Sequence, residues 1–257
     1  MSMKLKEITQ EELDQILEDH REWIGSDEED GERAILINID LRGVDLSYAN
    51  LQKANLRKSR LQGANLQHAN LIGADLRGAY LLDAELVGAN FSNADLRKAT
   101  MSSTDSTGAN FSNAKLRSAI MYAANFQNAN FSNANLKCAT LSHASLYDAN
   151  FSNACLQGAE LRGANINSAY FTDADLQGAC LMECNIFYSF FTRANLRNTR
   201  LEDIKIDLSF FEKADFRSAD FTHASISRTN LREADLRKTN IREADLKDSD
   251  LDCAKMD

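Results

Sequence analysis

A period of five residues runs through this chain and limits the folds open to it. From Leu41 to Met256 every fifth residue is large and apolar, with the one exception of Ser106. The residue two positions earlier is small and usually Ala, and the residue between the two is usually Asn or Asp. A spacing of five fits neither the turn of a helix nor the alternation of a strand. It predicts short extended segments joined by corners, with the large residue pointing inward from each side and the small one pointing inward near the corner.

A second period of twenty residues indicates how many sides each coil has. Phe occupies the central position at every twentieth residue from Phe91 to Phe211. The motif Asn-Phe-Ser-Asn-Ala recurs at 90–94, 110–114, 130–134 and 150–154. Twenty residues hold four units of five, so a coil is expected to have four sides, with like residues of successive coils stacked as in a parallel sheet. The chain contains no proline, which leaves every backbone N–H available as a donor.

These units resemble the pentapeptide-repeat family, whose consensus is Ala-(Asp or Asn)-Leu-x-x. The resemblance covers residues 39–257. It implies an all-β fold, a right-handed quadrilateral parallel β-helix, which the number of units sets at about 11 coils. We expect this pentapeptide-repeat β-helix to occupy residues 34–257. Inside it, Ser106 would leave a void in its column, and Phe126 one coil later is large enough to lean into that void.

Residues 1–33 have a different pattern and predict an N-terminal capping helix followed by an acidic loop. Thr9 and Glu12 have the spacing of a capping box, and apolar residues from Leu13 to Ile24 keep helical spacing. The helix is expected over about residues 10–24, with Trp23 or Ile24 covering the open end of the first coil. Such a cap is needed because the first coil of a solenoid otherwise exposes unpaired backbone and core.

The charge and the cysteines limit where the protein acts and what it binds. Of the net charge of −9, residues 1–33 contribute 12 acids and 4 bases, and residues 34–257 contribute 26 acids and 25 bases. The solenoid is therefore close to neutral. No apolar run is long enough to span a membrane, and Met1–Gln10 lacks the apolar core of a signal peptide. The five scattered cysteines lack disulfide or zinc spacing, so a cytoplasmic location is expected.

The residues needed for catalysis are not brought together by the repeat. The four histidines, His20, His68, His143 and His223, are at least 48 residues apart. No nucleophile–base arrangement and no phosphate-binding glycine loop is present in the sequence. We therefore expect no catalytic residues, no cofactor and no metal, and a protein that is not an enzyme.

One outward column of the solenoid is basic. A basic ladder along it could bind a polyanion such as nucleic acid. Alternatively, each base pairs locally with the Asp two residues before it, as at Asp75, Asp95, Asp215 and Asp235. The second interpretation is favoured, and direct nucleic-acid binding is held to be improbable. The members of the basic ladder are Arg57, Arg77, Arg97, Arg117, Lys137, Arg197, Arg217 and Arg237.

A second outward column changes from polar to aromatic. It has Asn at every twentieth residue from Asn50 to Asn150, then three aromatic residues, then Asn230 and Asp250. Large apolar side chains at positions that face water predict an interaction patch, for a partner or for a second copy. A self-stacking ladder that only stabilises the coils is an equal alternative. The aromatic patch consists of Tyr170, Phe187, Tyr188, Phe190, Leu208 and Phe210.

Two functions follow from these surfaces. The first is a non-enzymatic scaffold or adaptor that presents the aromatic patch to a protein partner or to its own copy. The second, implied by the resemblance, is a protector or inhibitor of a DNA-binding enzyme such as DNA gyrase, acting by mimicry of duplex DNA. The near-neutral solenoid argues against the second, because mimicry requires an acidic surface.

Overall fold

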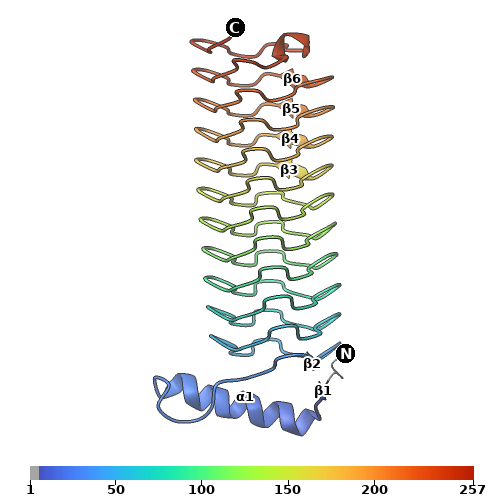
Figure 1. Cartoon of the computed structure of the whole chain (residues 1–257), viewed down its shortest axis with the longest axis vertical. Coiled ribbons are helices and arrows are strands. Elements are labelled where there is room, and N and C mark those ends of the chain that lie inside the picture. The colour runs from blue at the N-terminus through green and yellow to red at the C-terminus, as the bar shows by residue number, and fades with distance from the viewer. Residues whose placement is uncertain (1–5) are drawn as a thin grey trace.

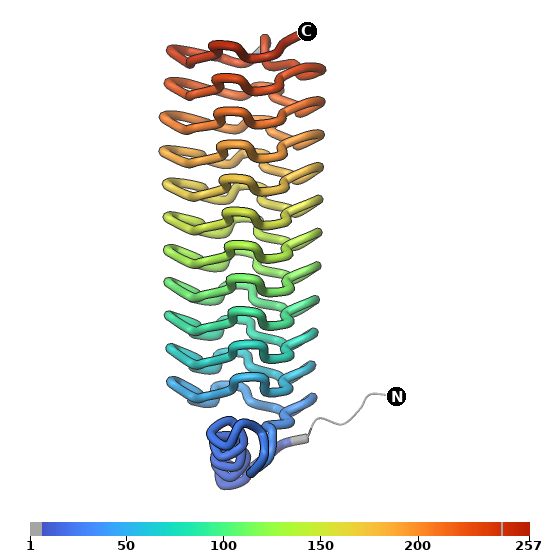
Figure 2. The backbone as a smooth tube through the Cα atoms, turned by 90° about the vertical axis from the view of Figure 1, so that its left-hand side faces the viewer, coloured from blue at the N-terminus to red at the C-terminus, as the bar shows by residue number. Residues whose placement is uncertain are grey.

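The structure, a computed structural model that describes residues 6–257, is a straight rod of stacked coils with a helix across one end (Figures 1 and 2). Residues 1–5, the start of the predicted cap segment, lie outside the described residues. Parallel β-bridges join residues twenty apart, such as Asp45 to Asn65 and Asn50 to Asn70. Each coil therefore stacks on the next in register, and the predicted solenoid is confirmed.

The two inward positions of the repeat form one continuous core. Central residues such as Leu51 and Phe131 and small residues such as Ala54 are all inaccessible to solvent. That Phe126 leans into the void at Ser106 stays a prediction. The ring of Phe126 packs edge-on against Phe111, in the coil of Ser106, with centroids 5.8 Å apart.

The backbone of each unit explains both the Asn or Asp preference and the lack of proline. Leu51 and Lys53 donate to the next coil (2.7 and 2.8 Å), Asn55 donates to the previous coil (2.9 Å), and Ala54 closes a turn onto Leu51 (3.0 Å). The fifth N–H belongs to the residue just after the central residue. It donates to the side chain of the residue just before the central residue. In one such pair Ser92 N–H donates to Asn90 Oδ1 at 3.0 Å. Every N–H of a standard unit thus has a partner, so a proline would remove a bond at any position.

The corner of each unit explains the residues found at its last position. That residue lies in the left-handed region, as for Asn93 and Lys98 with φ of 60°. Most side chains adopt this conformation only at a cost, whereas Gly, Asn and Asp adopt it readily. Large apolar residues are therefore unexpected there.

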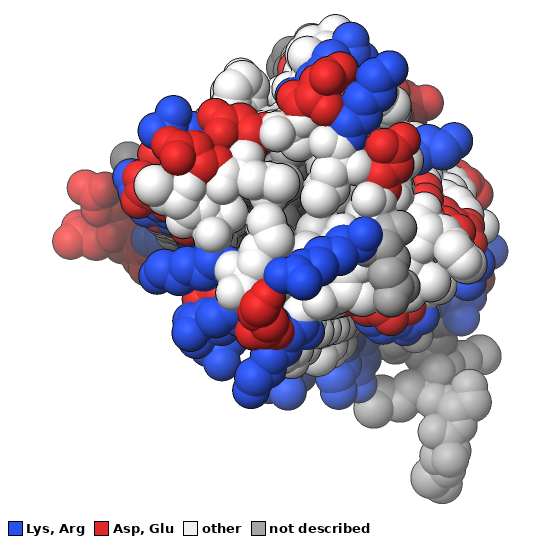
Figure 3. All heavy atoms as spheres, turned by 90° about the horizontal axis from the view of Figure 1, so that it is seen from above, with Lys and Arg blue, Asp and Glu red and all other residues white. Residues whose placement is uncertain are grey.

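Regular strands occur in only a few coils. The strand β2 (Ile39–Asp40) lies in the first coil, and a parallel sheet is formed by β3 (Asn165–Asn167), β4 (Asn185–Phe187), β5 (Lys205–Asp207) and β6 (Ser225–Ser227). In the last coil a short 3-10 helix, η1 (Ile241–Glu243), replaces one turn. At this C-terminal end, acidic and basic side chains lie next to one another (Figure 3).

The helix α1 (Gln10–Gly25) caps the other end, and its capping box between Thr9 and Glu12 is present as predicted. The residues that cover the first coil differ from the prediction. Leu13 and His20 are buried, whereas Trp23 and Ile24 remain partly exposed. His20 is held there because Ala34 N–H donates to its Nδ1 at 3.2 Å.

A short strand that the sequence did not reveal completes the cap. Strand β1 (Lys6–Glu7) pairs in parallel with β2, in the register Lys6 to Ile39. It supplies backbone partners to a strand that would otherwise be an open edge.

Candidate interaction surfaces

The aromatic patch lies where the corner of the coil changes. In a regular coil the N–H of Ala149 donates directly to the carbonyl of Leu146 at 3.1 Å. One coil later Ala169 N–H donates instead to Ser189 Oγ at 3.2 Å. The Ser189 hydroxyl in turn donates to the carbonyl of Ile166 at 2.7 Å. The hydroxyl therefore bridges the two backbone groups that the turn would have paired.

The next serine of the column, Ser209, takes the same place in the following coil. Ser189 N–H donates to Ser209 Oγ at 3.1 Å, and the Ser209 hydroxyl lies 2.9 Å from the carbonyl of Asp207. Opening the turn lets the preceding side extend, which is where β3 to β6 form. Sequence reasoning did not connect these serines with the patch. The signal was present, because the small position changes from Ala to Ser189, Ser209, Thr229 and Ser249.

The three aromatic rings of the column stack on one another. Tyr170 and Phe190 have centroids 5.1 Å apart and planes 7° apart, and Phe190 and Phe210 have centroids 5.1 Å apart and planes 4° apart. The stacking covers the faces of Phe190, while Tyr170 and Phe210 remain 43% and 41% exposed. The self-stacking ladder therefore forms, and it still presents its edges and ends to solvent.

The aromatic column replaces hydrogen bonds that the preceding coils make. An aromatic ring cannot accept from the N–H two residues later, as Asn150 does from Ser152 at 2.9 Å. Three such bonds, each contributing about 1 kcal/mol, are given up in succession. Two stacked pairs return about 0.5–1.5 kcal/mol each beyond their buried area. The two effects are similar in size before the apolar area that the stacked rings bury is counted.

The corner before this column adds further apolar surface. Tyr188 and Leu208 occupy the left-handed corner position, with φ of 56° and 50°. Tyr188 is 57% exposed, and Leu208 and the neighbouring Phe187 are partly exposed. A bulky apolar residue in this conformation is strained and is also exposed. The six residues of the predicted patch therefore lie in three successive coils and share one corner.

An ion pair borders the patch. Arg228 Nε donates to Asp207 Oδ1 at 2.9 Å, and Ser227 Oγ donates to the same oxygen at 2.8 Å. The Arg228 hydrogen bonds lower the pKa of Asp207. An apolar centre with a charged and satisfied rim is the usual anatomy of a protein interface.

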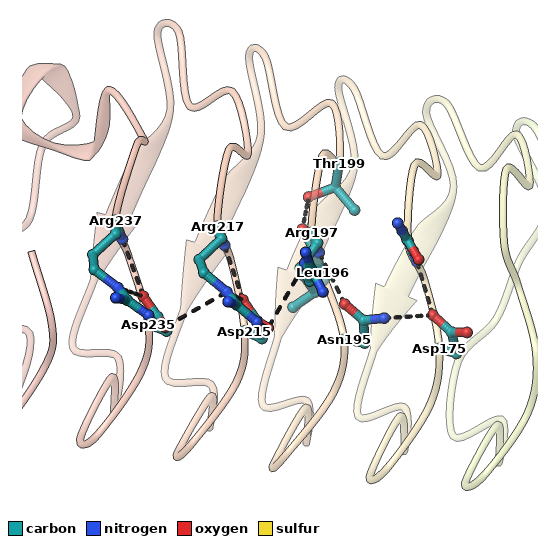
Figure 4. Close-up of polar contacts among 10 residues, drawn as sticks. Asp175, Asn195, Leu196, Arg197, Thr199, Asp215, Arg217, Asp235 and Arg237 are labelled. Atoms are coloured by element: carbon teal, nitrogen blue, oxygen red, sulfur yellow. Dashed lines mark hydrogen bonds and ion pairs between the residues drawn. The ribbon is translucent and has the colours of Figure 1, made fainter.

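Four of the eight bases of the basic ladder are paired with the Asp two residues before them, as for Arg217 and Arg237 (Figure 4). Arg217 Nε donates to Asp215 Oδ1 at 2.8 Å and also lies 3.6 Å from Asp235 in the next coil. Arg237 pairs with Asp235 in the same way, and its hydrogen bond lowers the pKa of Asp235 to about 2. Corresponding pairs join Arg77 to Asp75 and Arg97 to Asp95.

The first half of this ladder is less balanced than the second. Arg57 and Arg117 follow Asn55 and Lys115 rather than an Asp. They line a shallow groove whose other members are Lys58, Arg77, Gly78, Arg97, Lys98 and Ser118. The local pairing predicted from the sequence thus holds for four bases, while this groove keeps a positive charge.

Metal-ligand clusters, disulfides and membrane-spanning helices were also searched for among the described residues. In residues 6–257, no group of three or more His, Cys, Asp or Glu side chains could hold a metal ion. All five cysteines are unpaired. Within the same residues, no helix has the length and apolar character needed to cross a membrane.

The chain belongs to the pentapeptide-repeat family. The family's repeat profile matches it in repeated copies, over residues 32–63, 64–102, 84–122, 96–132, 124–163, 156–186 and 214–252. This confirms the resemblance read from the repeating units.

Several solved structures are similar to it. One is HetL, a pentapeptide-repeat protein involved in heterocyst differentiation regulation in the cyanobacterium Nostoc, with 27% identity, 91% of this chain and 92% of HetL covered, and a TM-score of 0.39. Another is QnrB1, a plasmid-mediated fluoroquinolone resistance protein, with 21% identity, 67% and 91% covered, and a TM-score of 0.36. A third is a pentapeptide-repeat protein of the Arabidopsis thaliana thylakoid lumen, with 34% identity, 41% and 66% covered, and a TM-score of 0.19. No curated protein matches the sequence.

Proposed function

We propose that this protein is a non-enzymatic interaction scaffold, a rigid right-handed rod of about eleven coils that binds a protein partner through the aromatic patch. The observation that carries the proposal is the exposure of Tyr170, Tyr188 and Phe210, at 41% to 57%, within three successive coils. Aromatic residues dominate the binding energy of protein interfaces, and exposed clusters of them are uncommon on monomers. The unpaired cysteines favour a reducing compartment such as the cytoplasm for this function.

The alternative, mimicry of DNA to protect an enzyme such as gyrase, has less support. Mimicry requires a continuous negative surface, but Asp215 and Asp235 are neutralised by Arg217 and Arg237 along the same column. A supercoiling assay with gyrase would detect such a role. We expect no protection of the enzyme by an excess of this protein.

The proposal is tested by returning the aromatic column to the residue that the preceding coils use. The variant Tyr170→Asn/Phe190→Asn/Phe210→Asn removes the rings and restores the acceptor for each turn, so it should fold. We expect it to lose the partner that the unaltered protein captures by cross-linking in a lysate of its source organism. Tyr147→Gln removes an exposed aromatic residue outside the patch and serves as the control. Capture of the same partner by all three proteins would contradict the proposal.

A further inference from the structure

A second apolar surface lies on the side of the rod opposite the aromatic column. It consists of the residues just before and just after the central residues Leu81, Met101, Met121 and Leu141, and we call it the apolar strip. None of these eight residues is charged. Four of them are large apolar side chains that are 41% to 49% exposed, namely Tyr80, Leu82, Ile120 and Tyr122.

Large and small side chains alternate along the apolar strip. Parallel bridges order one column as Tyr80, Thr100, Ile120, Thr140. The column beside it has the same alternation, with Leu82 and Tyr122 large and the serines 102 and 142 small. The large residues therefore form two ridges across the strip, separated by a furrow of hydroxyl side chains.

Both ends of the first column carry a charge, and the two charges are opposite. Arg60 bridges to Tyr80 at one end, and Glu160 bridges to Thr140 at the other. Neighbouring opposite charges hydrogen bond or pair with other residues, since Asp40 is bonded to Arg42 at 2.8 Å and Arg162 is paired with Glu183. The strip thus has a positive end, an alternating apolar middle and a negative end.

We infer that a second copy of this chain docks on the apolar strip in antiparallel orientation. A two-fold axis across the strip, midway between Thr100 and Ile120, reverses the rod and places each column on its own copy. Tyr80 then faces the partner's Thr140, and Ile120 faces the partner's Thr100. Each ridge enters a furrow of the partner, and Arg60 meets the partner's Glu160 at both ends.

This register is favoured over its neighbours. Moving the axis onto Thr100 would place Tyr80 against the partner's Ile120, so that ridges meet ridges and the furrows stay empty. It would also place Arg60 against the partner's Thr140 and leave the charge without a partner. The favoured register further brings Asp83, at the corner, opposite the partner's His143. Packing and charge select the same arrangement, which is what a self-complementary interface requires.

The strip is narrow, so the dimer is expected to be weak. Six coils at about 4.8 Å give a contact about 24 Å long, at the low end for a specific interface. We expect a micromolar dissociation constant. Because the aromatic patch lies on the opposite side of the coil, it remains open in the dimer. The inference goes beyond the proposed function and does not depend on it.

Charge reversal tests the inference. Arg60→Glu places a carboxylate against the partner's Glu160 at both ends, and we expect it to weaken dimerisation by about tenfold or more in sedimentation equilibrium. The double variant Arg60→Glu/Glu160→Arg restores opposite charges and should dimerise like the unaltered protein. Arg57→Glu reverses a charge on another side and should have no effect. A protein that is monomeric at about 200 µM, or a double variant that is not rescued, would overturn the inference.

Disulfide trapping tests the register independently. In a background of Cys138→Ser, Cys155→Ser, Cys180→Ala and Cys253→Ser, which also removes the thiol bridged to residue 160, the pair Arg60→Cys/Glu160→Cys should oxidise to a covalent dimer. Within one chain these positions are five coils, about 24 Å, apart, which is too far for an internal disulfide. Either single cysteine variant should remain unlinked, because its two copies lie at opposite ends of the dimer. Equal cross-linking of the single and double variants would contradict the antiparallel register.

Discussion

Thr104 and Ser106 form a hydroxyl-to-hydroxyl hydrogen bond of 3.2 Å inside the core of the rod. Thr104 Oγ1 also lies 2.9 Å from the carbonyl of Met101, which can only accept. The Thr104 proton therefore goes to Met101, and Ser106 donates to Thr104. Ser106, which breaks the apolar central position, thus finds its hydrogen-bond acceptor in a Thr at a position where the coils on either side have Ala84 and Ala124.

Removal of Thr104 should destabilise the rod through Ser106. Thr104→Ala leaves the buried Ser106 hydroxyl without an acceptor, and we expect a loss of about 1–3 kcal/mol in the free energy of unfolding. Adding Ser106→Ala should recover part of that loss, because no unpaired donor remains. Urea denaturation of both single variants and the double variant measures the coupling. Thr199→Ala, which removes a buried hydroxyl bonded to the carbonyl of Leu196 at 2.7 Å, is the control. Additive effects of the two substitutions would rule out the pairing.

The middle ring of the aromatic column should contribute most to stability. Phe190 stacks on two rings, whereas Tyr170 and Phe210 each stack on one within the column. We expect Phe190→Asn to lower the unfolding free energy by about 1 kcal/mol, since two stacked pairs are lost and one turn hydrogen bond is gained. Tyr170→Asn and Phe210→Asn should be nearly neutral. Equal denaturation midpoints for the three variants would show that stacking does not stabilise the column.

The cap should loosen on acidification because of His20. Burial lowers the pKa of His20, whereas in an unfolded cap it returns to about 6.5. The unfolded cap then binds more protons, so the stabilisation is complete above about pH 6.5 and is lost as the pH falls below that value.

Trp23 offers a local measurement of this loss. It is the only tryptophan and stacks on His20 with centroids 5.6 Å apart. Its fluorescence should change as the pH falls below about 6.5, while the circular dichroism of the rod stays constant. In His20→Gln the transition should be absent. A transition that persists in this variant would assign it to another group.

The neutralisation of the basic ladder can be measured at Asp235. Its pKa of about 2 depends first on the hydrogen bond from Arg237. Arg237→Gln should move that pKa upward, toward the ordinary value of about 3.9. Because the folded pKa is lowered, the pair stabilises the protein above about pH 4, and this contribution is lost as the pH falls toward 2. Titration of the Asp235 carboxyl by NMR gives this pKa. Arg117→Gln is the control, because Arg117 has Lys115 and not an Asp two residues before it, and it should leave the pKa of Asp235 unchanged.

Much of the fold could be predicted because the sequence repeats in step with the structure. Once Leu41 and Leu61 are known to be one coil apart, the residues that stack in a column follow by counting. The pairing of Arg217 with Asp215 could be predicted on this basis, since both point outward from the same side. The capping box at Thr9 and Glu12 is equally local, and its hydrogen bonds form within one turn of helix.

The packing of the N-terminal cap against the rod was predicted poorly. Trp23 and Ile24 were expected over the open end, but the placement of α1 buries Leu13 and His20 instead. The position of a helix relative to the rod is set by tertiary packing, and neither the period of five nor helical spacing specifies it. Strand β1 depends on the same placement.

The sequence by itself determined the solenoid, the four sides of each coil and the location of the irregular positions. These features follow from periodicity alone. Only the tertiary structure decided what the irregular positions do. Ser189 stands where Ala is usual, but its role appears once Ala169 N–H and the Ile166 carbonyl are seen on either side of its hydroxyl. Likewise, counting in twenties places Tyr80 and Ile120 in one column, but their exposure of 46% and 45% is seen only in the stacked coils. Hydrogen-bond geometry and exposure are properties of the stacked coils, and a repeat pattern does not contain them.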